Sequence, residues 1–216
     1  MIPKVIIHNQ ISLDGAVSVF DVNLEQYYGL SFQFDEGFRL FGSETVLKAP
    51  MADSPETELD YVKPDYDSKG GAPFWIIADS RGIVKNLHLL RRSMYCKDVI
   101  VFVSETTPKE HTDYLSERDY DYIIAGADRI DFNKALEKLY SDYDCRKILT
   151  DTGGTLASHL LSIGVVTKLS LIISPVLTGI GSDNYFSTLN KDSKISLKLV
   201  SCNSLPDGCV HIIYDI

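Results

Sequence analysis

The sequence predicts an α/β protein with a doubly wound, mostly parallel mixed sheet and a C-terminal antiparallel hairpin. Short apolar runs alternate with segments of helical periodicity, which is typical of a parallel sheet covered on both faces. The turn residues at 206–208 separate the last two apolar runs and therefore predict the hairpin. Polar residues or glycines follow several predicted strands directly, at the positions where such sheets bind ligands.

The strands are predicted from short apolar runs that end in turn residues or polar segments. The run Val5–His8 is compact and β-rich, which indicates a buried strand leading toward a turn at Asp14-Gly15. The same pattern predicts strands over 38–41, 74–78, 99–103, 122–125, 147–150, 169–173, 195–200 and 210–214.

Helices are predicted where apolar residues recur at helical spacing or where a capping residue opens a segment. Residues 132–143 are periodic and follow Asp131, a predicted N-cap. Ser43 is a predicted N-cap for a small helix over 44–48, and another helix begins at Pro108.

Two segments lack clear periodicity. Residues 23–34 are aromatic, and we expect a short helix followed by a loop. Residues 49–72 are rich in Pro, Asp, Ser, Lys and Gly, which predicts a long exposed loop. Because both flanks of that loop resemble parts of one sheet, we expect a single domain over 1–216.

Composition excludes several classes of function. The formal charge of −9 argues against a nucleic-acid partner or an anionic membrane surface. The four cysteines lack zinc-site spacing, so we expect reduced thiols and no metal, although Cys202 and Cys209 flank a turn and could face each other. No targeting segment or membrane-spanning run is recognised, which predicts a cytoplasmic protein.

The segment 147–161 is the strongest candidate for a ligand site. It begins as an apolar strand, bends at Gly153-Gly154 and continues as an amphipathic helix. A strand that passes through two glycines into a helix aims free N–H groups at one point, which favours a phosphate or pyrophosphate. Asp151, at the strand end, would face the same crevice. The alternative is a plain turn in which the glycines only relieve strain.

Five stretches in matching order resemble the riboflavin-biosynthesis reductase domain, the C-terminal domain of the bifunctional deaminase–reductase, which has a dihydrofolate-reductase-like fold. They are Asn9 to Gly15, Gly42 to Lys48, Ala78-Asp79-Ser80, Asp151 to Leu156, and Gly164 to Gly179. The resemblance spans nearly the whole chain apart from 16–37 and 49–72.

The resemblance implies an NADPH-dependent reduction of a ribosylaminopyrimidine phosphate to its ribitylamino form, by a homodimer. Hydride would pass from the nicotinamide to C1′ of an imine form of the sugar, while the protein positions both molecules and supplies a proton.

Candidate site residues follow from the resemblance and from placement beyond strand ends. The resemblance places Thr45, Ser80, Gly153, Gly154 and Thr155 at the cofactor. Strand-end placement adds Asp79 and Gly126, and a guanidinium at Arg81 could recognise the 2′-phosphate of NADPH. The substrate candidates are Asn9, Ser12, Asp14 and Asp151.

Asp14 and Asp151 are also the catalytic candidates. Asp151 matches the family's glutamate, which hydrogen-bonds the substrate ring. Asp14 could orient the substrate or relay a proton, and a simple turn-forming aspartate is the alternative.

One departure from the family bears on the substrate. No acidic residue directly follows the Thr-Val-Leu segment here, and the run 48–53 contains no arginine, whereas the family carries both. Another pterin, pyrimidine or small carbonyl substrate therefore remains an alternative, as does a non-catalytic nucleotide-binding module. A hydrolase or other transferase is less favoured, since no nucleophile elbow, P-loop or metal-ligand spacing occurs.

Overall fold

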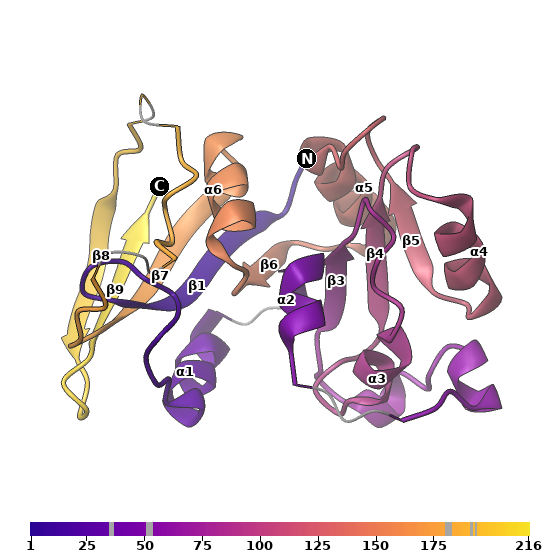
Figure 1. Ribbon diagram of the computed structural model, residues 1–216, viewed down its shortest axis with the longest axis horizontal. Coiled ribbons are helices and arrows are strands. Elements are labelled where there is room, and N and C mark those ends of the chain that lie inside the picture. The colour runs from indigo at the N-terminus through magenta and orange to yellow at the C-terminus, as the bar shows by residue number, and fades with distance from the viewer. Residues whose placement is uncertain (35–36, 51–53, 180–182, 191, 193) are drawn as a thin grey trace. The chain divides into compact units, whose positions relative to one another are not determined.

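The computed structural model describes residues 1–34, 37–50, 54–179, 183–190, 192 and 194–216. It divides into two compact units, unit 1 with Met1–Pro3 and Gly37–Ile148, and unit 2 with Lys4–Glu36 and Leu149–Ile216. Strand β6 (Lys147–Thr150) belongs to both. The predicted fold class is confirmed, since parallel strand pairs alternate with helices and the last two strands are antiparallel (Figure 1).

Unit 1 is built on four parallel strands in the order β5-β4-β3-β2. Their bounds are β2 (Phe38–Gly42), β3 (Phe74–Ala78), β4 (Val99–Val103) and β5 (Asp121–Ile124). The helices between and after them are α2 (Ser43–Lys48), α3 (Leu87–Arg92), α4 (Lys109–Glu117) and α5 (Phe132–Tyr143).

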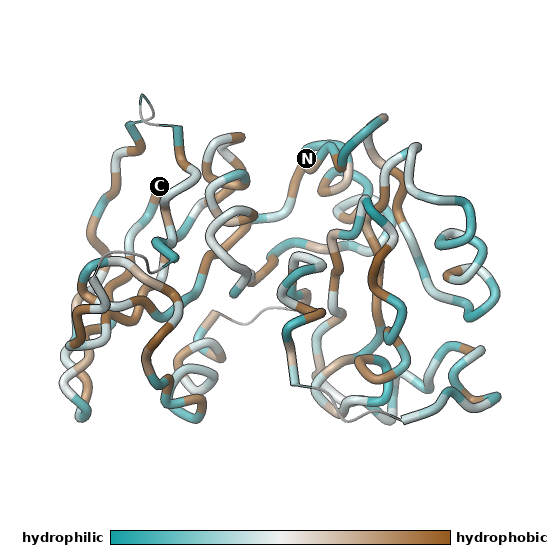
Figure 2. The backbone as a smooth tube through the Cα atoms, viewed as in Figure 1, coloured by the Kyte–Doolittle hydropathy of each residue, from teal (hydrophilic) through white to brown (hydrophobic). Residues whose placement is uncertain are grey.

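Strand β4 shows why this sheet is covered on both faces. All five of its residues are buried, and Figure 2 shows the strand coloured as hydrophobic. Val99, Val101 and Val103 pack with residues of α2, α3 and α4. On the other face, the ring of Phe102 lies 6.4 Å from that of Phe132 in α5. Such two-sided burial accounts for the unbroken apolar run of a central parallel strand.

Unit 2 combines one parallel pair with an antiparallel edge. Its strands are β1 (Lys4–Ser12), β7 (Val166–Ser174), β8 (Lys198–Ser204) and β9 (Val210–Asp215), in the order β1-β7-β9-β8. The β1–β7 pair is parallel, and the β7–β9 and β9–β8 pairs are antiparallel. Its helices are α1 (Leu24–Ser31) and α6 (Gly154–Ser162). Within the described residues, no helix is long and apolar enough to cross a membrane.

A buried polar chain crosses three strands of unit 2. His8 Nε2 lies 3.1 Å from the Tyr27 carbonyl oxygen, and His8 Nδ1 lies 2.9 Å from Ser170 Oγ. Because a carbonyl only accepts, a neutral His8 carries its proton on Nε2, and its Nδ1 accepts from the Ser170 hydroxyl. His211 Nε2, 2.8 Å from Ser170 Oγ, is then a donor. Both ring nitrogens of the buried His8 therefore have hydrogen-bond partners within the fold.

The His211 side chain makes the stability of the protein depend on pH. It is 3% exposed, and burial lowers its pKa below the ordinary histidine value. The unfolded chain therefore takes up this proton first as pH falls, so stability is complete above the unfolded pKa of about 6.5 and declines below it.

As pH falls from about 7.5 to about 5.5, we expect the free energy of unfolding, measured by urea denaturation, to decrease. This group contributes up to about 1.4 kcal/mol per pH unit to the decrease. His211→Gln should flatten the slope, whereas the exposed His159→Gln should keep it. An unchanged slope in His211→Gln would contradict the assignment.

Several boundaries differ from those predicted. Gly42, not Ser43, is the N-cap of α2, and Ser43 is the first helical residue. Residues 195–197 precede β8 and are not part of a strand. Helix α3 was not predicted, because its six residues leave little room for a periodic pattern. Cys202 lies opposite Ile212 and is a free thiol, as is Cys209.

The segment 49–72 is more ordered than a simple exposed loop. It contains two 3₁₀ turns, η2 (Glu58–Tyr61) and η3 (Asp67–Lys69), while 51–53 lie outside the described residues. Asp60, in η2, is 3% exposed and accepts a hydrogen bond from Arg92 Nε at 2.8 Å. The segment is therefore held by charged side chains that lie far away in the sequence.

Arg91 is the centre of this arrangement. Its guanidinium is almost fully buried and donates to Asp98 Oδ1 at 2.8 Å. It also donates to carbonyl oxygens of η2, of the residue following it and of the end of α4, namely Asp60, Val62, Arg118 and Asp119. The ring of Tyr120 lies 3.7 Å below it. One buried cation thus joins η2, α3, the start of β4 and the end of α4.

Candidate functional site

The loop after β3 carries three predicted cofactor residues of unit 1, Asp79, Ser80 and Arg81. Its shape is set from within, because Asp79 Oδ2 accepts from Val84 N at 2.8 Å and the Asp79 carbonyl accepts from Gly82 N at 3.2 Å. Thr107 Oγ1 donates to the Ser80 carbonyl at 2.8 Å. Asp79 is 1% exposed, so its carboxylate shapes the loop from inside, while Ser80 is half-buried.

A histidine packs beneath this loop. His111 Nε2 lies 3.6 Å from Asp79 Oδ2, and both ring nitrogens lack a hydrogen-bond partner among the described residues. Burial lowers the pKa of His111, against the opposing effect of Asp79. A Cβ at Gly82, where φ is +64°, would lie 2.8 Å from His111 Cβ. The imidazole therefore supports the loop as a neutral group, and no sequence pattern pointed to it.

Arg81 projects from the loop into solvent and meets the start of α2. It forms an ion pair with Glu44 and donates to Ser43 Oγ at 3.5 Å. The side chains of Arg81 and Glu44 are 57% and 62% exposed. Thr45, the next helical residue, is half-buried in the first turn of α2. The structure therefore brings Thr45, Ser80 and Arg81 to neighbouring strand ends, as their sequence positions predict.

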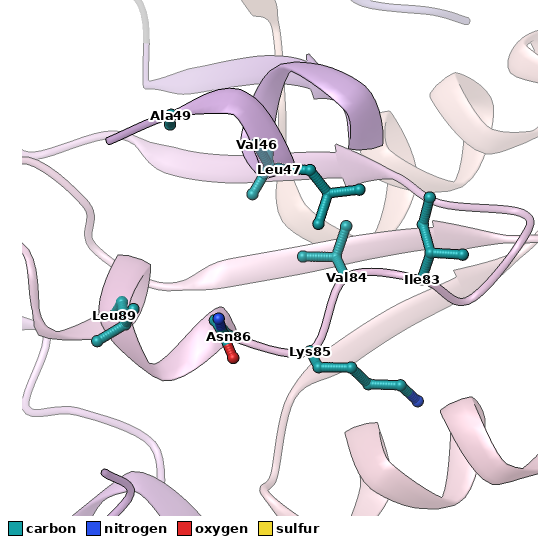
Figure 3. A pocket seen from close by; sticks show the side chains of 8 residues that line it. All are labelled: Val46, Leu47, Ala49, Ile83, Val84, Lys85, Asn86 and Leu89. Carbon is teal, nitrogen blue, oxygen red and sulfur yellow. The ribbon is translucent and has the colours of Figure 1, made fainter. Parts of the chain in front are cut away.

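A cavity of about 440 Å³ lies between α2 and the segment from the β3 loop to α3 (Figure 3). Most of its lining is apolar, and Lys85 and Asn86 add one amine and one amide group. The lining residues are Val46, Leu47, Ala49, Ile83, Val84, Lys85, Asn86 and Leu89. Such a surface suits a flat, weakly polar ring with one polar edge.

Gly126, the remaining unit 1 candidate, has a structural reason to be glycine. Its φ is +87°, and an added Cβ would lie 2.2 Å from the Arg129 carbonyl oxygen and 2.8 Å from Asp131 N. Its own carbonyl accepts from Glu105 N at 2.9 Å. The turn that leads into α5 therefore accounts for this glycine without a ligand.

In unit 2, the carboxylate of Asp14 ties two loops together. It accepts from Ser12 Oγ at 2.5 Å, from Gly179 N at 2.8 Å and from Thr178 N at 3.1 Å. Ser12 Oγ also accepts from Ala16 N at 2.8 Å. The Ser12 hydroxyl and the Gly179 amide hold the pKa of Asp14 well below its usual range. A carboxyl held ionised in this way favours the turn-forming alternative over a proton relay.

Asn9 and Asp151 lie at the diglycine bend. Asn9 Nδ2 donates to the Thr152 carbonyl at 3.0 Å, which fixes the chain just before the bend. Asp151 is half-buried directly after β6. Helix α6 starts at Gly154 with Gly153 as N-cap and no side-chain capping bond. The first N–H groups of an uncapped helix are suited to an anion.

The two glycines of the bend have different surroundings. An added Cβ at Gly153, which is exposed, would meet no described atom within 4 Å. A Cβ at Gly154 would lie 2.3 Å from the Tyr185 carbonyl oxygen. The close approach predicted at Gly154 is therefore made by the protein's own backbone, and Gly153 and the exposed Thr155 face outward.

Tyr185 is the residue of this region that sequence reasoning missed. It is fully buried, and its N–H donates to the Gly15 carbonyl at 2.8 Å. Burial raises the pKa of its hydroxyl, the Asn9 side chain lowers it and the charge of Asp151 raises it. Tyr185 thus lies close to three predicted site residues, Asn9, Asp151 and Gly154. Its sequence neighbourhood carries no periodic pattern that would signal a buried aromatic ring.

Comparison with known proteins places these features in a family. Residues 3–211 match the model of the RibD C-terminal domain family. Relatives from Aquifex aeolicus and Methanothermobacter thermautotrophicus, both named 2,5-diamino-6-ribosylamino-4(3H)-pyrimidinone 5′-phosphate reductase, are 25% and 24% identical over 191 and 188 residues. The matches cover 82% and 83% of this chain and 79% and 81% of the relatives.

Solved structures share the fold. A pyrimidine reductase-like protein from Corynebacterium diphtheriae has a TM-score of 0.75 at 17% identity, covering 99% of this chain and 91% of that one. The riboflavin biosynthesis reductase Rib7 from Saccharomyces cerevisiae has a TM-score of 0.69 at 19% identity, covering 99% and 90%. With the family match over residues 3–211, the resemblance predicted from five short motifs is confirmed, and the chain belongs to the RibD C-terminal domain family.

Proposed function

We propose that this protein is an NADPH-dependent reductase that converts the ribosylamino side chain of a pyrimidine phosphate to its ribitylamino form. The observation that carries the proposal is the family match over nearly the whole chain, together with relatives named as reductases of such a substrate. We further propose that the enzyme works in the cytoplasm and, as the resemblance implies, as a homodimer; size-exclusion chromatography with light scattering would test the oligomeric state.

Each unit, taken by itself, offers groups of the kind that bind a dinucleotide cofactor. In unit 1 the proposed contacts are the Thr45 and Ser80 hydroxyls and the Arg81 guanidinium, and the apolar cavity would accept an aromatic ring. In unit 2 they are the open Gly153, the start of α6 and Thr155. Hydroxyls, a guanidinium and uncapped N–H groups are the donors that phosphate oxygens require.

The other candidate residues would orient the substrate or shape the loops around it. When bound, the reduced nicotinamide would supply hydride. Asp151 would hold the substrate ring through hydrogen bonds, and Asn9 would fix the bend beside it through its bond to the Thr152 carbonyl. Asp79 and Gly126 would shape the loops that carry the cofactor contacts. Ser12 and Asp14 would shape the substrate-side loop, since Ser12 donates to Asp14 and Asp14 also accepts from Thr178.

Titration of the protein with NADPH and with NADH tests this proposal before any substrate is known. The chain has a single tryptophan, Trp75, which lies in β3, the strand whose loop carries Ser80 and Arg81. We expect saturable quenching of its fluorescence and energy transfer to the bound nicotinamide. Failure of both coenzymes to bind would overturn the proposal.

Asp151→Asn is expected to lower turnover by about 10²-fold or more while the Kd for NADPH changes less than about threefold. The amide keeps the shape of the side chain but replaces one of the two acceptor oxygens by a donor and removes the negative charge. Single-turnover oxidation of NADPH with the ribosylaminopyrimidine phosphate, combined with the titration above, separates the two effects. Equal losses in turnover and affinity would remove the substrate-side role.

A second substrate class is favoured by one sequence observation: no acidic residue directly follows the Thr-Val-Leu segment, and the run 48–53 contains no arginine. A phosphorylated substrate needs a well-placed cation, and the family's arginine is absent from this run. NADPH oxidation should therefore be compared between the ribosylaminopyrimidine phosphate, its dephosphorylated form and a dihydropterin precursor. A preference for an uncharged compound would assign a related reductase activity.

A further inference from the structure

The ion pair between Arg81 and Glu44 lies just beyond the carboxyl ends of β2 and β3, beside the proposed cofactor contacts of unit 1. β2 and β3 are parallel and pair in register, with Gly42 opposite Ala78. Glu44 follows β2 in the first turn of α2, and Arg81 follows β3 in its loop. The two side chains therefore meet because their strands end side by side, although they are 37 residues apart in the sequence.

Both members of the pair are charged at neutral pH. The hydrogen bond from Arg81 and its positive charge lower the pKa of Glu44 below its ordinary value, and Lys48 adds a smaller effect in the same direction. Since both side chains are more than half exposed, the pair is weak and a ligand can displace it. A ligand that approaches Arg81 therefore meets a carboxylate that competes for the guanidinium.

This competition has opposite consequences for the two nicotinamide coenzymes. NADPH carries a 2′-phosphate, which a guanidinium binds through paired hydrogen bonds but a carboxylate repels. NADH carries a 2′-hydroxyl at the same place, and carboxylates accept a hydrogen bond from that group in dinucleotide-binding proteins. A guanidinium and a carboxylate that share one position can therefore accept either coenzyme, each through a different partner.

We propose that Glu44 is a specificity-determining residue that, by holding Arg81, lowers the preference of this protein for NADPH over NADH. The inference rests on the proposed function, because it places the adenosine ribose at the edge of unit 1 where Glu44 and Arg81 lie. It differs from that function in predicting a coenzyme preference of this chain, set by two exposed residues outside the reacting centre.

The test measures, by isothermal titration calorimetry of the full chain, the affinities for NADPH, NADH, 2′,5′-ADP and 5′-AMP. The last two probes carry the adenosine end alone, so their affinity ratio isolates the contribution of the 2′-phosphate. In Glu44→Gln, removal of the competing negative charge should raise the preference for 2′,5′-ADP over 5′-AMP by about five- to tenfold. Arg81→Gln should lower the affinity for 2′,5′-ADP about tenfold or more and leave that for 5′-AMP within about twofold.

Asp113→Asn is the matched control. Asp113 pairs with Lys109 at 2.6 Å on α4, also on the surface, so its loss removes one exposed negative charge without touching Arg81. The control should leave the NADPH-to-NADH and the 2′,5′-ADP-to-5′-AMP affinity ratios unchanged. Thermal midpoints should confirm that all three variants are folded. A change in Asp113→Asn equal to that in Glu44→Gln would show a general charge effect and overturn the inference.

The two failures are distinguishable. If neither coenzyme binds the wild-type chain, the proposed function fails and the inference fails with it. If both coenzymes bind but Glu44→Gln leaves the NADPH-to-NADH and the 2′,5′-ADP-to-5′-AMP ratios at their wild-type values, the proposed function stands and the inference alone is overturned.

Discussion

Gly154→Ala is expected to lower the free energy of unfolding by about 2–3 kcal/mol, because the new methyl group has no space to occupy. Its Cβ would lie 2.3 Å from the carbonyl oxygen of Tyr185 and 3.0 Å from the carbonyl carbon. The obstacle is backbone, so a change of side-chain rotamer cannot relieve the clash. Either α6 or the Tyr185 segment must move. Urea denaturation measures the loss, and an unchanged midpoint would contradict the contact.

Gly153→Ala is the matched control, one residue earlier in the same bend. Its φ of −65° is accessible to any residue, and an added Cβ there would meet no described atom within 4 Å. We expect stability within about 0.5 kcal/mol of the wild type. If the proposed function holds, a larger residue such as valine at 153 should then weaken NADPH binding without destabilising the fold, since Gly153 is proposed to contact the cofactor.

This pair of substitutions separates two explanations for a diglycine bend. A loss of coenzyme affinity in Gly154→Val by itself would not show that a pyrophosphate approaches that residue, because Tyr185 already does so. A loss at position 153 with an intact fold would point to the ligand. The packing of Tyr185 against Gly154 therefore decides which of the two glycines is informative about function.

Arg91→Met is expected to destabilise the protein by about 3–5 kcal/mol, the usual cost of removing one member of a buried ion pair. Asp98 would remain 2% exposed without its guanidinium. Burial already raises the pKa of Asp98, and Arg91 opposes that effect. The carbonyl oxygens of Asp60, Val62, Arg118 and Asp119 would also lose their donor. Chemical denaturation measures the change.

The double variant Arg91→Met, Asp98→Asn distinguishes an uncompensated charge from lost packing. Replacing the carboxylate by an amide removes the buried charge, so the double variant should be more stable than Arg91→Met alone by about 1–2 kcal/mol. Arg81→Gln is the exposed control and should change stability by less than about 1 kcal/mol. A double variant no more stable than the single one would show that the donor bonds to backbone, not the charge, dominate.

The fold class could be predicted from the sequence because hydrophobic periodicity is a local property. The run 99–103 is apolar throughout, and a strand buried on both faces requires this. Helix α5 and its N-cap Asp131 were placed from the same kind of signal, and Asp131 accepts from Lys134 N at 3.2 Å. The short α3 has too few residues for a periodic signal, and the 49–72 segment is ordered by Arg91 and Arg92 of α3, which lie far from it in the sequence.

Within unit 1, the placement of Thr45, Ser80 and Arg81 followed from strand ends, since the carboxyl ends of parallel strands lie at one edge of a sheet. Their contacts did not follow, because these join residues distant in the sequence. Tyr185 against Gly154, His111 beneath Asp79, and Glu44 on Arg81 are all of this kind.

By itself, then, the sequence determined the α/β architecture and the family, through local periodicity and short motifs in register. Only the tertiary structure decided which polar groups are already engaged within the protein and which face outward. Burial and hydrogen bonding depend on the packing of distant segments, and no local pattern contains that information.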